Sequence, residues 1–198
     1  MQILQNRYSW SLVEIKGVNQ ISDYKKQLWK KLDNLSKEWQ STGLPSRSGL
    51  EKAAGDLDEW KVITGVSGLW DKPPLMLTAT IDDGLGHGLE VIRMFSETAG
   101  LKTIELGLLL TPEKIITACK RHQPDLLGIT VLQFDSEEDI SMISKNLPLK
   151  IKIIAGGPVF TADREFAARA GIHFTAKNAA YFIQYLLQFE KKVTKNHK

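Results

Sequence analysis

Two adjacent carboxylates, a histidine and three glycines stand together in residues 82–88, which read Asp-Asp-Gly-Leu-Gly-His-Gly. Glycine lacks a Cβ and tolerates positive φ, so the backbone of such a loop can approach a large ligand closely. Asp82 and Asp83 are neighbours in a loop and need not share one site as a general acid and base. We therefore interpret this segment first as a ligand-facing loop.

Two other segments carry groups that suit a ligand site. Thr130 ends an apolar run and offers a hydroxyl, and the pair Gly156-Gly157 follows a later apolar run and leaves space beside it. The residues around them are apolar, and we expect the same slot to be lined by Val131, Leu132, Pro158, Val159 and Phe160. A wide apolar slot with a few polar groups suits a large flat ligand better than a phosphorylated one.

The elements that must position these residues alternate regularly along the second half of the chain. Strands are predicted for residues 75–81, 102–106, 125–132, 150–155 and 172–175. Helices are predicted for residues 86–98, 112–121, 137–146, 162–170 and 178–189. The strands are apolar runs rather than alternating patterns, which indicates burial on both faces. We predict an α/β fold, a doubly wound five-stranded parallel sheet of the flavodoxin-like order 2-1-3-4-5, which binds ligands beyond the carboxyl ends of its strands.

Residues 1–74 have a different character and predict a small helical region. Helices are expected over residues 22–40 and 49–62, whereas residues 1–19 suit either a short strand or an N-terminal arm. All five tryptophans fall in this region, at Trp10, Trp29, Trp39, Trp60 and Trp70. Either these large rings build the core of a small helical layer, or one or two of them cover an aromatic or macrocyclic ligand. The domains expected are residues 1–74, residues 75–190 and a basic tail, 191–198.

The bulk composition excludes several classes of protein. Of the 198 residues, 42% are apolar and 25% charged, as in soluble globular proteins. The net charge of +3 comes with no basic patch of the density that a nucleic-acid groove needs. We see no membrane span and no signal peptide, and a single cysteine suits a reducing compartment. We therefore expect a cytoplasmic protein with no direct nucleic-acid or membrane partner, and no grouping of residues has metal-site spacing.

Other families with this fold fit the loop poorly. A receiver domain needs an aspartate at the end of its third strand, and here that strand ends in Thr-Val-Leu-Gln-Phe. A flavodoxin needs a hydroxyl-rich phosphate loop where this chain has two carboxylates. The glycines at 84, 86 and 88 are spaced Gly-x-Gly-x-Gly, which does not match the dinucleotide fingerprint, and the acids would repel a pyrophosphate.

The motifs resemble those of the cobalamin-binding domain shared by methionine synthase, corrinoid methyltransferase proteins, carbon-skeleton mutases and cobalamin-dependent regulators. That family carries Asp-x-His-x-x-Gly after the first strand, Ser-x-Leu at the third and Gly-Gly after the fourth. This chain has Asp83-Gly84-Leu85-Gly86-His87-Gly88, then Thr130-Val131-Leu132, then Gly156-Gly157, and residues 156–179 match the family's run to the last helix. The resemblance covers residues 75–190. It implies that cobalamin or a related corrinoid is held by these motifs, with Thr175 included.

The metal ligand of the family is missing. Its histidine, which replaces the dimethylbenzimidazole base as lower ligand of cobalt, falls at Leu85, and leucine has no lone pair to donate. The family's serine is Thr130, and an aspartate common near the last strand is His173. Three consequences remain open. The corrinoid binds base-off without a protein ligand, or His87 supplies the ligand from a displaced loop, or cobalamin binding is lost.

The resemblance implies a corrinoid-binding protein that acts as a carrier or accessory subunit in methyl transfer or cobalamin handling. No stretch of the chain looks like a substrate-activating barrel, so we expect a cofactor-binding subunit that works with a methyltransferase or a regulator rather than a complete enzyme. Residues 1–74 stand where many family members carry a helical module over the upper face of the corrinoid. The alternative is a non-enzymatic sensor or interaction module that binds a tetrapyrrole or has lost its cofactor.

Overall fold

The computed structural model describes the backbone of residues 3–195 and the side-chain surroundings of residues 20–192. Its centre is a five-stranded, all-parallel sheet in the order β2-β1-β3-β4-β5. The strands are β1 (Leu75–Thr80), β2 (Lys102–Gly107), β3 (Leu126–Thr130), β4 (Lys152–Gly156) and β5 (Phe174–Ala176). The predicted fold class and strand order are therefore confirmed.

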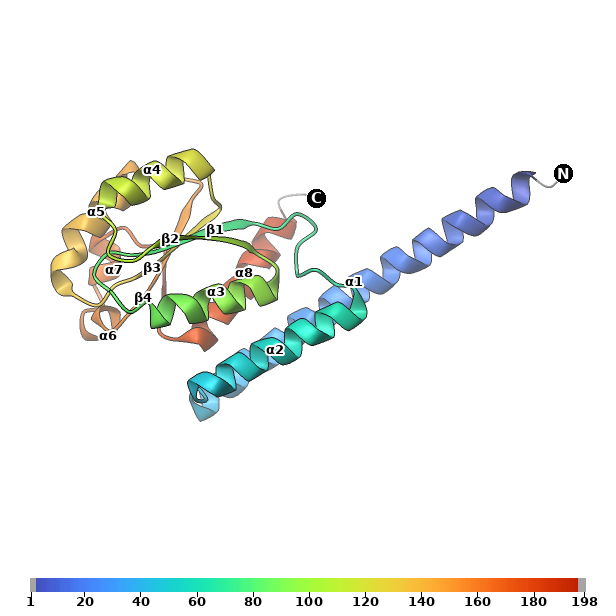
Figure 1. Ribbon diagram of the computed structural model, residues 1–198, viewed down its shortest axis with the longest axis horizontal. Coiled ribbons are helices and arrows are strands. Elements are labelled where there is room, and N and C mark those ends of the chain that lie inside the picture. The colour runs from blue at the N-terminus through green and yellow to red at the C-terminus, as the bar shows by residue number, and fades with distance from the viewer. Residues whose placement is uncertain (1–2, 196–198) are drawn as a thin grey trace.

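Helices cover both faces of the sheet (Figure 1). One face carries α3 (His87–Ala99) and α8 (Ala179–Lys195), and their apolar residues form one core cluster with side chains from β1, β3 and β4. The other face carries α4 (Pro112–His122) and α5 (Glu137–Asn146), with a second cluster beneath them. A single 3₁₀ turn, η1 (Phe134–Ser136), precedes α5. Because crossovers are right-handed, successive βα units divide between the two faces.

The three central strands are buried on both faces, whereas the two edge strands are not. The residues of β3 are all buried, and those of β1 and β4 are buried except at their first positions. The edge strand β2 is half-exposed, because it has a neighbour on one side only. In β5, the other edge strand, only Ala176 is fully buried. The prediction that every strand is buried on both faces was therefore wrong for β2 and β5.

The predicted helix over residues 162–170 is also wrong, because the segment forms two short helices, α6 (Val159–Ala162) and α7 (Phe166–Arg169). Asp163 lies between them in an extended conformation, and its Oδ1 accepts hydrogen bonds from the N–H groups of Glu165 (2.9 Å) and Phe166 (3.2 Å). An aspartate that binds nearby backbone N–H groups competes with helix continuation in this way.

The N-terminal region is a helical hairpin of α1 (Ile3–Thr42) and α2 (Arg47–Thr64). A short strand near the N-terminus, one of the two alternatives for residues 1–19, is therefore wrong, because that segment belongs to α1. Figure 1 shows the first half of α1 projecting beyond the rest of the molecule. The second half of α1 packs along α8, and α2 packs along α3. Leu28 and Leu32 of α1 share one core cluster with Phe95 of α3 and Phe182 of α8.

The described tryptophans pack within the helical region and between that region and the α/β layers. Trp39 meets Phe95 edge-on with ring centroids 5.5 Å apart, and Trp70 lies 6.3 Å from Phe189. Trp60 packs edge-on against Tyr24, and Lys191 lies over the ring of Trp29. Trp10 lies outside the residues whose side chains are described. Large rings thus serve the core of the helical layer, as the first of the two sequence interpretations predicted.

Candidate functional site

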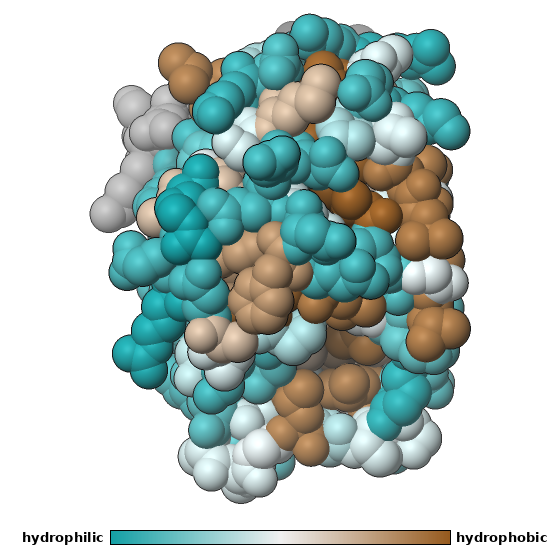
Figure 2. Space-filling view, turned by 90° about the vertical axis from the view of Figure 1, so that its left-hand side faces the viewer, coloured by the Kyte–Doolittle hydropathy of each residue, from teal (hydrophilic) through white to brown (hydrophobic). Residues whose placement is uncertain are grey.

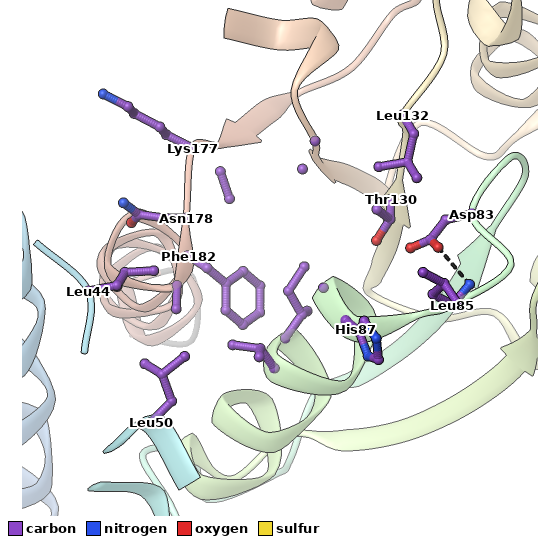
Figure 3. A pocket seen from close by; sticks show the side chains of 17 residues that line it. Leu44, Leu50, Asp83, Leu85, His87, Thr130, Leu132, Lys177, Asn178 and Phe182 are labelled. Carbon is purple, nitrogen blue, oxygen red and sulfur yellow. Dashed lines mark hydrogen bonds between the residues drawn. The ribbon is translucent and has the colours of Figure 1, made fainter. Parts of the chain in front are cut away.

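A cavity of about 430 Å³ opens at the carboxyl ends of the strands, between the first turns of α3 and α8 (Figure 3). Most of the predicted ligand-facing residues line it, namely Asp83, Leu85, His87, Gly88, Thr130, Leu132, Gly156 and Gly157. They come from the loops after β1, β3 and β4, which the parallel sheet brings to one edge. The position beyond the strand ends is where open α/β sheets bind ligands.

Three predicted site residues are not among those that line the cavity. Gly84 is exposed on the loop beside Leu109. Gly86 is buried as the N-cap of α3 with φ of +70°, which is why glycine suits that position. Thr175 lies inside β5, paired with Ala155 of β4. These residues shape the loop and the sheet around the cavity.

The loop after β1 is held by hydrogen bonds between the Asp83 side chain and the backbone of the same loop. The Oδ1 atom of Asp83 accepts hydrogen bonds from the N–H groups of Leu85 (2.8 Å) and Gly86 (3.1 Å). The hydroxyl of Thr80 donates to the carbonyl of Asp83 and accepts from the N–H of Leu109, 3.0 Å away. The Asp-Gly-Leu-Gly turn is therefore fixed against both β1 and the loop after β2.

Asp82 binds the loop after β3 instead of its own loop. Its carboxylate accepts hydrogen bonds from the N–H groups of Leu132 (3.0 Å) and Gln133 (2.9 Å) and from the hydroxyl of Ser136 (2.7 Å). It thereby fixes the loop after β3. Because the two neighbouring acids bind separate loops, they do not form an acid and base pair.

The Gly-Gly turn after β4 has a structural reason that differs from the predicted one. Gly157 has φ of +143°, and a Cβ there would lie 1.8 Å from the carbonyl oxygen of Val131. Glycine is therefore required for the close approach of the β3 and β4 ends, rather than to open space for a ligand. Val131 and Val159 are buried in the core on the opposite face of the sheet. The prediction that these residues, together with Pro158 and Phe160, line the slot was wrong.

The other wall of the cavity was not predicted from the sequence. It consists of Leu44 and Leu50 from the helical hairpin, Val91 and Ile92 from α3, and Ala179 and Phe182 from α8. The helical periodicity of these segments predicts apolar faces. It does not reveal which apolar side chains border a cavity, because that depends on how α3 and α8 diverge where they leave the sheet.

Thr130 is the buried polar side chain of the cavity that lacks a partner. The residue is 6% exposed, and its Oγ1 atom makes no hydrogen bond with any described residue. Buried hydroxyls in proteins are ordinarily satisfied. Figure 3 shows this oxygen directed toward the cavity, where a ligand acceptor would satisfy it.

The mouth of the cavity is apolar and open. Figure 2 faces the carboxyl ends of the strands and shows hydrophobic side chains gathered around a hollow in this face. Exposed side chains at these strand ends include Leu85 (73% exposed), Leu109 (60%) and Leu132 (39%). A polar solvent-facing loop does not need such residues, and a cluster of them marks a binding surface.

Of the described histidines, one lies at the mouth of the cavity. His87 is the first residue of α3, is exposed and borders the cavity. His173 lies away from the cavity, where its Nδ1 accepts a hydrogen bond from the N–H of Ile153 (3.1 Å) and burial lowers its pKa. His122 ends α4. Within the described residues, no group of three His, Cys, Asp or Glu side chains is arranged to hold a metal ion.

An ion pair ties the helical hairpin to the rim of the cavity. Arg47, at the start of α2, donates to Glu90 of α3 (2.8 Å) and to Glu51 (2.7 Å). The guanidinium of Arg47 lowers the pKa of Glu90 through this hydrogen bond. The contact holds the turn that carries Leu44 beside the first turn of α3.

Cys119 is a core residue rather than a nucleophile. It lies on the buried face of α4, and burial raises the pKa of its thiol to about 12. The thiolate that nucleophilic chemistry needs is therefore absent at neutral pH. In the part of the chain that the structure describes, no helix is both long and apolar enough to cross a membrane.

A model of one protein family matches the chain over residues 80–180, slightly more than half its length, and that family is described as the B12 binding domain. The match spans the loop after β1, the end of β3, the Gly-Gly turn and the start of α8. No curated protein sequence is a significant match.

Solved structures share the fold at low sequence identity. A cobalamin-binding protein from Desulfitobacterium hafniense is 16% identical with a TM-score of 0.73, over 93% of this chain and 90% of that one. The methanol:cobalamin methyltransferase complex MtaBC from Methanosarcina barkeri aligns at 15% identity and a TM-score of 0.60, over 89% and 68%. The monomethylamine corrinoid protein from the same organism is 15% identical with a TM-score of 0.53, over 82% of this chain and 96% of that one.

Proposed function

The chain belongs to the B12-binding domain family, and on that basis we propose that it binds a corrinoid in the cavity between α3 and α8. We propose further that it holds the corrinoid base-off without a histidine ligand. In this proposal it serves as a carrier or accessory subunit for a methyltransferase. The observation that carries the proposal is the convergence of three separate family motifs on one apolar cavity.

The residues present fit the buried base of a corrinoid. The inner part of the cavity is lined by Ile92, Phe182 and Ala176, which would pack against a flat aromatic base. Thr130 offers a buried hydroxyl without a partner. An apolar pocket with few, well-placed polar groups is typical of a site for such a ligand.

The residues at the mouth fit the corrin ring. Leu85 occupies the family's ligand position, borders the mouth and presents only methyl groups to whatever lies above it. A bound corrinoid supplies a cobalt ion that can carry a methyl group between two partners. The chain's own part is to bind and orient the cofactor, while Leu44 and Leu50 exclude water from the slot at the hairpin side.

The proposed absence of a lower protein ligand has a chemical consequence. The ligands of a metal set the electron density on it, and outer residues tune that density further. Leu85 has no lone pair, so this chain would offer cobalt no donor at the family's ligand position. His87 is the one alternative imidazole on the described lining of the cavity, and it starts α3 two residues later.

A partner protein is part of the proposal. Asp82 and Asp83, in the loop after β1, both accept hydrogen bonds from backbone N–H groups and are committed to the shape of the loops. Activation of a methyl donor is therefore assigned to a separate methyltransferase. The exposed leucines around the mouth would lie at the meeting point of the two proteins.

The proposal is tested by mixing the protein with hydroxocobalamin, removing free cofactor by desalting and recording the absorbance spectrum. We expect a retained chromophore with a base-off spectrum. Gly88→Leu should abolish retention, because a side chain there would grow from a position 3.6 Å from Thr130 Oγ1 into the slot. Gly55→Leu is the matched control. Gly55 is an exposed residue of α2, and a Cβ added there would have no neighbouring atom within 4 Å. If the wild-type protein retains no chromophore after desalting, corrinoid binding is refuted.

A further inference from the structure

The two helices of the hairpin rest on the two walls of the cavity. The second half of α1 packs along α8, and α2 packs along α3. On the cavity side, α8 contributes Ala179 and Phe182, whereas α3 contributes Val91 and Ile92. The turn between α1 and α2, residues 43–46, therefore connects the two walls across the cavity.

Each wall is fastened to the hairpin at its cavity end. The hydroxyl of Ser36, a residue of α1 that is 1% exposed, donates to the carbonyl of Ala180 in the first turn of α8 (2.9 Å). Arg47, at the start of α2, donates to Glu90 in the first turn of α3 (2.8 Å). A change in the distance between α3 and α8 at the cavity must therefore also strain the hairpin.

The turn that joins the two helices is short and stiff. Proline fixes its own φ, and Pro45 packs on the first turn of α2, where a Cβ on Gly49 would lie 2.8 Å from its Cβ. Ser46 Oγ accepts a hydrogen bond from the N–H of Gly49 (3.3 Å), and the N–H of Gly43 donates to the carbonyl of Trp39 (3.1 Å). These contacts limit how far α1 and α2 can separate.

The same turn places an apolar side chain on the cavity. Leu44 is 38% exposed and lines the cavity together with Leu50, which is 6% exposed. Figure 3 shows both leucines on the side of the cavity away from Thr130 and Asp83. The hairpin thus closes the side of the cavity that the sheet and its loops leave open.

We propose that the helical hairpin is a clamp that sets the width of the cavity between α3 and α8, with Leu44 as the residue that determines how tightly the nucleotide tail of a corrinoid is held. This role rests on the proposed function, which places the base at the end of that tail in this cavity. Corrinoids that carry a nucleotide tail gain affinity from the clamp, and those without one do not.

The clamp should act mainly on release of the corrinoid. A tail can leave the cavity only after Leu44 moves aside or the two walls separate, and the stiff turn resists both movements. Differences in affinity among variants of one site are expressed mostly in the rate of dissociation. The chain would therefore keep its corrinoid as a resident cofactor.

The first test truncates Leu44 and compares two corrinoids by titration followed by absorbance. They are cobalamin and cobinamide, which lacks the nucleotide. We expect Leu44→Ala to weaken cobalamin binding by about tenfold, because apolar contact is lost, and to leave cobinamide binding unchanged. Leu149→Ala is the matched control, since Leu149 is 92% exposed in the loop before β4, at the opposite edge of the sheet. It should change neither affinity.

The second test lengthens the turn and removes no side chain. Two glycines inserted between Leu44 and Pro45 should speed the release of cobalamin by about tenfold, because Leu44 and the two walls gain freedom to move. Release is followed by desalting the diluted, loaded protein at timed intervals. The same insertion between Leu149 and Lys150 is the control, and circular dichroism checks that each variant folds.

The outcomes separate the two proposals. If the wild-type protein binds neither corrinoid, the proposed function and the clamp are both refuted. If cobalamin binds and its affinity and release are unchanged in both turn variants, the proposed function stands and the clamp is refuted. If the variants weaken cobinamide as much as cobalamin, the hairpin supports the whole site, and its role in holding the tail is refuted.

Discussion

In the proposed function, Leu85 is the residue on which the chemistry at cobalt depends most. It stands at the position where the family's motif carries the cobalt-binding histidine, and it is 73% exposed at the mouth of the cavity. Its side chain supports no neighbouring element, so its identity is free to follow function. The turn around it is held by the backbone bonds to Asp83 and does not depend on the side chain at 85.

Leu85→His should therefore introduce a metal ligand without disturbing the fold. Exposed substitutions of this kind change stability by at most about 0.5 kcal/mol. We expect the variant loaded with Co(II) cobalamin to show nitrogen splitting in its electron paramagnetic resonance spectrum. Leu85→Gln provides a polar control without an imidazole, and an identical spectrum for both variants would argue against this placement of residue 85.

Asp83 should be needed for the shape of the binding loop. Asp83→Ala leaves two loop N–H groups without their acceptor, and we expect a loss of about 1–3 kcal/mol in the free energy of unfolding. Cobalamin affinity should fall with it, because the loop borders the cavity. Asp83→Asn keeps a carbonyl acceptor and should be milder. Denaturant titration and cobalamin titration measure both effects, and equal losses for Ala and Asn would contradict the role given to the acceptor.

At the scale of elements, the segment between α2 and β1 depends on a close backbone approach. A Cβ on Gly68 would lie 2.4 Å from the Cα of Gly100, and the N–H of Leu69 donates to the carbonyl of Ala99 (2.9 Å). Gly68→Ala should therefore cost about 1–3 kcal/mol by overpacking. Gly55→Ala, in an open helix position, should instead stabilise by about 0.5–1 kcal/mol. Thermal unfolding of the two variants should shift in opposite directions, and a shared direction would contradict this account.

The elements also show what the sequence could and could not predict. Apolar runs such as residues 75–81 and 125–132 predicted the strands, because a buried parallel strand needs an unbroken apolar sequence. The order of the strands was predicted from the right-handed crossovers of successive βα units. The break at Asp163 was missed, since a helical periodicity continues across it while its carboxylate binds the backbone locally. On the motif side of the cavity, Thr130 lies on the wall, and its part in ligand binding stays a prediction. The opposite wall, with Phe182 and Leu50, was not predicted, because no local pattern marks which face of a helix borders empty space.

At the scale of the whole molecule, the helical hairpin and the α/β layers share a core. Trp39 is 5% exposed and packs on Phe95, so the hairpin lies on α3 and α8 as a further layer. It also contributes Leu44 and Leu50 to the cavity. A separation of hairpin and α/β layers would expose apolar surface on both, and we therefore expect them to fold together.

Two spectroscopic probes can test this cooperativity. All five tryptophans lie in residues 1–74, so fluorescence reports on the helical region, while far-ultraviolet circular dichroism reports on all helices and strands. Denaturant transitions by the two probes should coincide, as in two-state unfolding. Trp39→Ala should shift both together by about 3–5 kcal/mol. Transitions that separate would show that the hairpin unfolds independently.

The most direct test of the central claim is the electron paramagnetic resonance spectrum of the wild-type protein loaded with Co(II) cobalamin and freed of unbound cofactor. A nitrogen ligand below cobalt splits the cobalt lines into triplets, and free base-on cobalamin shows this splitting. We predict a retained signal without the nitrogen triplets, which would mean that neither the base nor a histidine binds the lower face. Either no retained signal, or triplets that disappear in His87→Ala, would contradict a corrinoid held base-off above Leu85.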